Sequence, residues 1–252
     1  MREAPRYTVF GDPAREPVVR VSTFAPGGGA LEVHLCVMPR PDGRGFAAEL
    51  ADLERAYERA LRALDLPAGS VLFRRFFLSD AANQEQALLA SPLARTDPDN
   101  PFALSLVEQP PLPEGRIALW AWHVRDEGRA LAKEARPGGL VLVRPGARHL
   151  LTTDLAPPPA GPPAAQTRAL FQRYAALLAE ERASLKEHVL RTWLFVHSVD
   201  LNYAEMVSAR AALFREAGLT EATHYIASTG IEGRRRDPRA LVQLEAYALP
   251  GL

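Results

Sequence analysis

The stretch RTWLFVHSVDLNYAEMVSARAALFREAGLTEATHYIASTGIEG, from Arg191 to Gly233, carries the clearest fold signal in the sequence. It opens with a short run of β-branched and aromatic residues, which is typical of a strand. Apolar residues at helical spacing follow, so we predict a helix from Asn202 to its closing Gly218. HYIAST, beginning at His224, returns to strand character. The stretch therefore predicts a strand–helix–strand unit.

Similar patterns lie on both sides of this unit. ALVQLEAYAL, from Ala240 to Leu249, is typical of a final strand, and the spacing between Gln166 and Lys186 predicts another helix. Upstream of that helix, APPPAGPPAA contains five prolines, which favour a stiff, extended spacer. We place the domain boundary there: a first domain of residues 1–155, a Pro-rich linker of 156–165, and a second domain of 166–252.

The first half shows the same succession of patterns. Two alternating runs around the GGG turn at 27–29 predict a hairpin, and a helix is expected from Gly45 to Asp65. The further expected elements are a strand at 71–78, a helix at 79–89 capped by Ser or Asp, strands at 102–109 and 117–124, and a hairpin of 140–143 with 148–153.

The two halves look like one design used twice. TWLFVHSVD pairs in pattern with VLFRRFFLSD, and LVQLEAYAL pairs with RIALWAWHV. We therefore predict an α+β protein of two tandem units, each a mixed β-sheet with helices packed on one face.

Composition excludes several classes of function. Thirty basic residues balance thirty acidic ones, so no overall positive field favours nucleic acid or an anionic membrane. The sequence contains no apolar run of membrane-span length and no apolar signal-peptide core. Cys36 is the only cysteine and no CxxC or CxxH spacing occurs, which favours a cytoplasmic protein without a metal site. Nucleotide, flavin, serine-hydrolase and zinc-protease motifs are also absent, so we expect no cofactor.

Two segments resemble the Rid (YjgF-like, reactive-intermediate deaminase) superfamily. SDAANQ with SLVEQPPLPEGRIALWAWHV is similar to the strand, turn and final strand of Rid-type proteins, and the stretch from Arg191 resembles the chorismatase-like two-domain branch. The resemblance implies two tandem Rid/chorismate-mutase-like units. Chorismatases hydrolyse the enolpyruvyl ether of chorismate without a cofactor. Rid-type deaminases are homotrimers that hydrolyse imines with an Arg clamp and a late-strand Glu, so the resemblance implies a homotrimer here.

The resemblance also implies positions for the site. In the second unit the Arg position falls at or next to His224, and the Glu position falls at Gln243 or, with a shifted register, at Glu245. Because Gln243 and Glu245 are two residues apart on one strand, they share a face and either could reach one cleft. In the first unit these positions fall near Ala103 and Ala118, which can neither clamp an anion nor move a proton. We therefore expect the first domain to have no chemistry of its own.

Other candidate residues follow from their types and spacing. Arg210 shares a helical stripe with Tyr203 and Phe214, which favours a carboxylate-binding role. The alternative is a surface Arg paired with Glu216 or Glu205.

Small residues near the predicted strand at 224–229 suggest a ligand cleft. His224 and Tyr225 precede AlaSerThrGly, where Thr229 could donate a hydrogen bond and Gly230 could take a positive φ. The alternatives are a structural role for His224 and, for Thr229, a hydroxyl that bonds the backbone of its own turn.

Two carboxylates are candidates for acid–base work, Glu245 on the last strand and Glu232 on the loop before it. The alternative roles are a salt bridge to a neighbouring strand for Glu245 and a solvated loop charge for Glu232. The leading hypothesis is a cofactor-free hydrolase or lyase acting on a small carboxylate such as a chorismate-like enol ether, with Arg210 as clamp and Glu245 as proton donor. An imine or enamine deaminase and a non-catalytic small-ligand-binding module are the alternatives.

Overall fold

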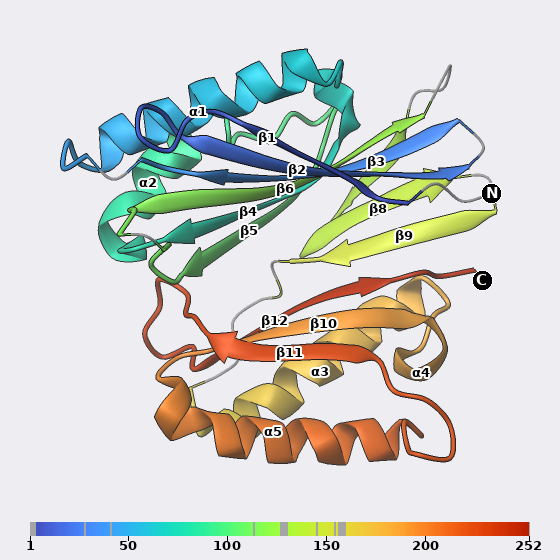
Figure 1. The fold of residues 1–252 in the computed structure, drawn as a ribbon. Coiled ribbons are helices and arrows are strands. Elements are labelled where there is room, and N and C mark those ends of the chain that lie inside the picture. The colour runs from blue at the N-terminus through green and yellow to red at the C-terminus, as the bar shows by residue number, and fades with distance from the viewer. Residues whose placement is uncertain are drawn as a thin grey trace. The chain divides into compact units, whose positions relative to one another are not determined.

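The computed structural model describes residues 4–27, 29–40, 42–112, 114–126, 131–144, 146–153, 155 and 160–251. The chain divides into two compact units, Met1–Ala132 and Lys133–Leu252. Each unit contains one six-stranded sheet, and its helices cover one face of that sheet (Figure 1).

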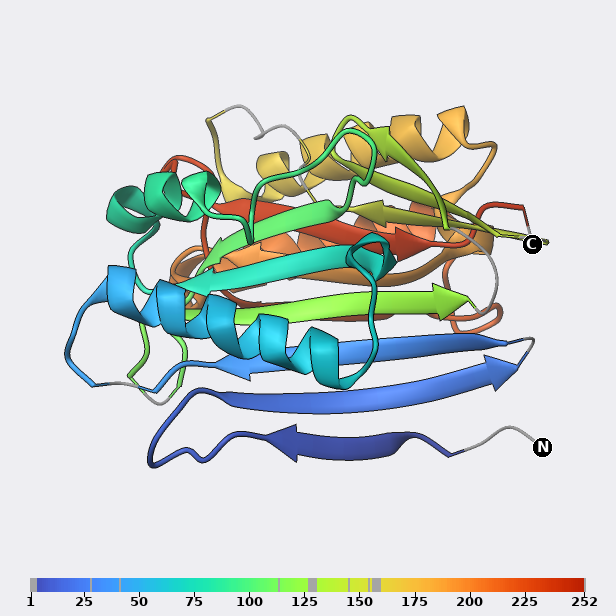
Figure 2. The ribbon, with the colours of Figure 1, turned by 90° about the horizontal axis from the view of Figure 1, so that it is seen from above.

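The first unit opens with a three-stranded antiparallel meander and continues as α1–β4–α2–β5–β6. Its elements are β1 (Arg6–Phe10), β2 (Val18–Gly27), β3 (Ala30–Met38), α1 (Phe46–Ala63), a short 3₁₀ turn (Ala68–Ser70), β4 (Val71–Leu78), α2 (Ala81–Ala90), β5 (Ala103–Glu108) and β6 (Ile117–Asp126). The sheet order is β1-β2-β3-β6-β4-β5, and β4 with β5 forms a parallel pair at one edge. Figure 2 shows α1 lying along this sheet. Strand β1 forms the sheet edge opposite to β5. Strand β1, short and mostly exposed, was not predicted.

The second unit repeats this succession. Its elements are β7 (Ala132–Arg136), β8 (Gly139–Arg144), β9 (Ala147–Thr152), α3 (Pro163–Glu180), α4 (Leu185–His188), β10 (Val189–Val196), α5 (Val199–Glu216), β11 (Ala227–Glu232) and β12 (Val242–Ala248). The sheet order is β7-β8-β9-β12-β10-β11, again with a parallel pair, β10 and β11, at one edge.

The two sheet orders are equivalent strand for strand. β10 occupies the place of β4, and β12 occupies the place of β6, as the paired sequence patterns predicted. The prediction of an α+β protein with two tandem units, each a mixed sheet with helices on one face, is confirmed.

The division of the structure differs from the predicted boundary at the Pro-rich segment. β7, β8 and β9 precede that segment, yet β9 pairs with β12, with Thr152 opposite Ala246. Val141 and Leu150 also belong to the core of the second unit. Of the predicted linker, residues 156–159 lie outside the described residues, and its last three residues already belong to α3. Prolines begin this helix readily because the first helical turn needs no backbone N–H partner.

A chain of polar groups crosses the core of the first unit. Arg74 Nε donates to the Tyr57 hydroxyl, which lies 2.8 Å from His123 Nε2. The Ser70 hydroxyl donates to the Pro67 carbonyl at 2.6 Å and lies 2.8 Å from His123 Nδ1. Since the Ser70 proton is used in that bond, His123 Nδ1 is the donor to Ser70, and in the neutral ring with this tautomer Nε2 accepts from Tyr57.

We expect Tyr57→Phe to lower the free energy of unfolding by about 1–3 kcal/mol, because a buried acceptor on His123 loses its donor. Urea denaturation of both proteins measures the difference. Tyr7→Phe is the matched control, since Tyr7 is 80% exposed. Equal midpoints for wild type and Tyr57→Phe would contradict the donor assignment.

None of the helices in the described part of the chain is long and apolar enough to cross a membrane.

Candidate functional site

The predicted site residues divide between the two faces of the second sheet. α3 packs on β12, and α5 packs on β10 and β11, which defines the helix face. Gly230 lies on this face, because a Cβ added there would meet Tyr203 Cε2 at 2.8 Å and Met206 Cε at 3.0 Å. Gly230 has no positive φ, contrary to the prediction, and its role is to make room for α5. Ser228 shares the helix face, whereas Thr229 points to the opposite face.

The same alternation places the candidate acid–base residues on β12. Leu244 and Ala246 belong to the core under the helices, so Gln243 and Glu245 lie on the opposite face. Arg210 lies on α5 and binds Ser228 on the helix face. The sheet therefore separates Arg210 from Glu245, and the predicted pairing of these two residues in one cleft is wrong.

The opposite face holds a polar cluster of Arg191, Thr229, Gln243 and Glu245 around Trp193. Glu245 is fully buried, and its Oε1 accepts a 2.8 Å hydrogen bond from Gln243 Nε2. Trp193 is the cross-strand partner of Glu245. The Arg191 guanidinium lies 4.9 Å from the centre of the Trp193 ring, and Nη2 donates to Thr229 Oγ1 at 2.9 Å.

Two buried polar atoms of this cluster lack a hydrogen-bond partner among the described residues. They are Gln243 Oε1, which can only accept, and Arg191 Nε, which can only donate. Because buried polar atoms are almost always paired with protein or water, the cluster has capacity left for a ligand or a water molecule.

Arg191 was not among the predicted site residues. The alternation in RTWLFV places Arg191, Trp193 and Phe195 on one strand face, and β10 pairs with β11 so that Arg191 lies opposite Ala227. That alternation was the signal in the sequence that could have identified it.

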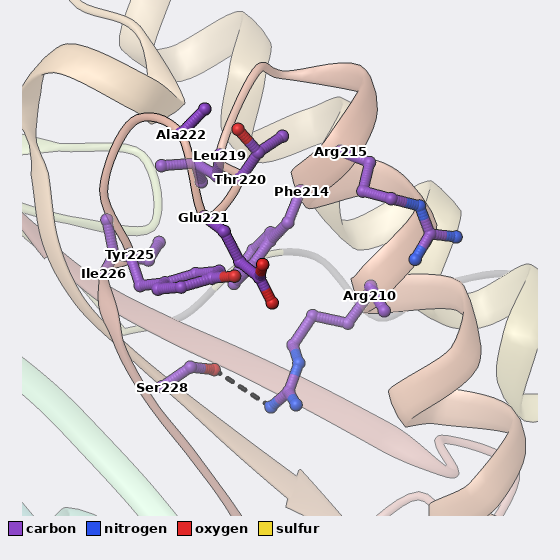
Figure 3. Close-up of a pocket in the computed structure, with 11 residues that line it drawn as sticks. Arg210, Phe214, Arg215, Leu219, Thr220, Glu221, Ala222, Tyr225, Ile226 and Ser228 are labelled. Carbon is purple, nitrogen blue, oxygen red and sulfur yellow. Dashed lines mark hydrogen bonds between the residues drawn. The ribbon is translucent and has the colours of Figure 1, made fainter.

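A cleft of about 750 Å³ lies on the helix side of β11, between α5 and the segment that leads into the strand (Figure 3). Residues that line it include Arg210, Phe214, Glu221, Tyr225, Ile226 and Ser228. Arg210 Nη1 donates to Ser228 Oγ at 3.1 Å, and Thr192 Oγ1 donates to the same oxygen at 2.8 Å. Tyr225, 65% exposed, lies at the rim.

His224 has a structural contact instead of a place in the strand. Its Nε2 lies 2.9 Å from the Lys186 carbonyl oxygen, and pairing with β10 begins only at Ala227. The predicted strand start at His224 is therefore three residues early.

Glu232 caps a helix. Its two carboxylate oxygens accept from the backbone N–H groups of Ser198 at 3.1 Å and Val199 at 2.6 Å, at the start of α5. The N-cap residue Ser198 makes no side-chain capping bond itself. The structure thus gives Glu232 a helix-capping contact.

His149 on β9 also lies on the opposite face, with Nδ1 2.7 Å from the Tyr247 hydroxyl. Burial, assisted by the charge of Arg144, lowers the pKa of His149 to about 4. The unfolded chain takes up this proton near its ordinary pKa of 6.5, whereas the folded protein resists it down to about pH 4. The contribution of His149 therefore lowers stability as the pH falls through this window.

We expect wild type to lose more stability between neutral pH and about pH 4 than His149→Phe. In wild type, the unfolded chain binds a proton at His149 that the folded protein does not bind, and Phe has no such proton. Thermal unfolding of the two proteins over a pH series measures this difference. Parallel stability curves would show that His149 does not titrate as described.

In the described ranges, no group of three or more His, Cys, Asp or Glu side chains is arranged to hold a metal ion.

No protein-family model matches the sequence, and no curated protein matches it. Among solved structures, the chain is similar to a chorismatase. The aligned region covers 96% of this chain and 78% of the chorismatase chain, with a TM-score of 0.58 and 13% sequence identity. A YjgF-family protein from Neisseria meningitidis, NMB1025, covers 47% of this chain and 93% of its own, with a TM-score of 0.38 and 20% identity. The alignment with the YjgF gene product of E. coli covers 49% of this chain and 89% of the YjgF chain, with a TM-score of 0.35 and 17% sequence identity. The chain therefore has the two-domain fold of the chorismatase, built from two tandem units of equivalent strand order.

Proposed function

We propose that this protein is a cofactor-free hydrolase of a small carboxylate metabolite, with its catalytic centre in the cluster of Arg191, Thr229, Gln243 and Glu245. The observation that carries the proposal is the pair of buried, unpartnered polar atoms beside a buried carboxyl group. The substrate we infer is a chorismate-like enol ether, by analogy with the chorismatase of the same fold.

Arg191 is the carboxylate clamp in this proposal. A guanidinium presents a fixed fork of donors that matches a carboxylate, and its hydrogen bond to Thr229 fixes its direction. The half-buried Arg191 and Thr229 lie nearest the sheet edge, since β11 is the edge strand. A ligand that enters from this edge meets them before it meets Glu245.

Glu245 is the proton donor. Protonation of the terminal methylene carbon of an enolpyruvyl ether gives an oxocarbenium ion, and water adds to its carbon. The hemiketal then releases an alcohol and pyruvate, while the proton lost by water returns to the carboxylate. A carboxyl group suits this exchange, because the same group can give a proton and take one back. The hydrogen bond from Gln243 holds its orientation.

The test is pyruvate release from chorismate by purified protein, with Arg191→Ala alongside. A charged hydrogen bond contributes about 1.5–3 kcal/mol, so we expect the variant to lose roughly 10- to 100-fold in kcat/KM. Arg168→Ala, which removes an exposed Arg on α3, is the matched control. If wild type releases no pyruvate, chorismate is not the substrate.

Imine hydrolysis is the second candidate, and the buried Gln243–Glu245 pair favours it. An iminium carbon is already electrophilic, so a carboxylate that activates water is sufficient. Ammonium release from 2-iminopropionate tests this reaction. Binding of either compound without turnover would instead support a small-ligand-binding module.

The homotrimer implied by the sequence resemblance stays a prediction. The mass of the protein in solution, measured by light scattering, tests it.

A further inference from the structure

The cleft on the helix face is separate from the proposed catalytic centre. Arg210 and Ser228 lie on the helix face, whereas Glu245 lies on the opposite face of the same sheet. Within one chain, a ligand held by Arg210 therefore lies on the other side of the sheet from Glu245.

Opposite charges face each other across this cleft without pairing. Figure 3 shows the Arg210 guanidinium and the Glu221 carboxylate pointing into the same space, from α5 and from the segment before β11. No ion pair joins Glu221 to Arg210 or to Arg215 in the part of the chain that the structure describes. A ligand with a negative and a positive group could therefore bridge them.

Arg210 is held in place for an anion. One guanidinium nitrogen donates to Ser228, which also accepts from Thr192, and the guanidinium lies 5.9 Å from the centre of the Phe214 ring. These contacts use part of the guanidinium and restrict its rotation, so the remaining donors are oriented in advance.

Apolar groups line the rest of the cleft. Phe214, Leu219, Tyr225 and Ile226 supply aromatic and aliphatic surface beside the two charges. We propose that this cleft is a second ligand site that binds a free α-amino acid with an apolar or aromatic side chain. Arg210 binds its carboxylate, Glu221 binds its ammonium group, and the Phe214–Tyr225 wall packs on its side chain.

The experiment is calorimetric titration of the full chain with three related probes. L-phenylalanine carries both charges, 3-phenylpropanoate lacks the ammonium group, and 2-phenylethylamine lacks the carboxylate. We expect L-phenylalanine to bind wild type, and Arg210→Ala or Glu221→Gln to weaken its binding about tenfold or more. Glu221→Gln should leave 3-phenylpropanoate binding unchanged, and Arg210→Ala should leave 2-phenylethylamine binding unchanged.

Two controls separate this site from the catalytic centre and from misfolding. Arg191→Ala and Arg168→Ala should bind L-phenylalanine as wild type does, whatever their effect on pyruvate release. Glu221 is exposed, so Glu221→Gln tests the site even if Arg210→Ala disturbs the fold. The proposal fails if wild type does not bind L-phenylalanine at millimolar concentration, if Glu221→Gln binds it normally, or if only Arg191→Ala abolishes binding.

Discussion

Glu245→Gln should lower kcat for pyruvate release from chorismate by about 100-fold or more, with a much smaller change in KM. General acid–base groups contribute about 10²- to 10⁴-fold, and an amide cannot supply the proton. The replacement is nearly isosteric, and its amide oxygen can still accept from Gln243, so the 2.8 Å hydrogen bond need not be lost. Steady-state kinetics measure both constants.

The expected split between kcat and KM distinguishes catalysis from packing. Arg191 and Thr229, which bind the substrate carboxylate in the proposal, are unchanged in Glu245→Gln, so ground-state binding should be kept. Glu187→Gln, on the exposed surface of α4, removes the same charge and serves as control. Wild-type kcat in Glu245→Gln would remove Glu245 from the mechanism. If Glu245→Gln loses activity only because its melting temperature falls and the protein unfolds at the assay temperature, Glu245 has a structural role.

Alternation and helical spacing predicted most of the helices and strands and the repeat of one pattern in the two units. The paired patterns of TWLFVHSVD with VLFRRFFLSD correspond to β10 and β4, which occupy equivalent places in their sheets. The domain boundary was not predictable in the same way. Prolines report local backbone preference, whereas the membership of β9 in the second unit depends on its pairing with β12, in which partners such as Thr152 and Ala246 are 94 residues apart.

The candidate site was predictable only in part, because spacing shows which residues share a face but not which face a helix covers. Gln243 and Glu245 were expected on one face, and their hydrogen bond confirms this. That Arg210 approaches Ser228, on the face away from Glu245, depends on how α5 packs over β11. Local periodicity does not determine tertiary packing of this kind.

The second large effect is expected at Gly139, where the backbone of β8 closely approaches β9. A Cβ at this position would lie 2.0 Å from the Leu151 carbonyl oxygen, and backbone cannot move aside as a flexible side chain does. We expect Gly139→Ala to lower the free energy of unfolding by at least about 1–3 kcal/mol, the usual cost of overpacking. Urea denaturation measures it, and Gly161→Ala, whose nearest neighbour would be 3.9 Å away, is the control.

The effect of Gly139→Ala should extend to the proposed catalytic centre. Gly139 is paired with Thr152, and Thr152 is paired in turn with Ala246, the residue after Glu245. If β9 shifts to relieve the clash, β12 loses its register partner, and the Glu245 carboxyl group moves relative to Arg191. We therefore expect pyruvate release to fall even where the variant is still folded, because small misplacements of catalytic groups lower rates strongly. A folded Gly139→Ala variant with wild-type activity would show that β12 holds its position without the β8–β9 hairpin.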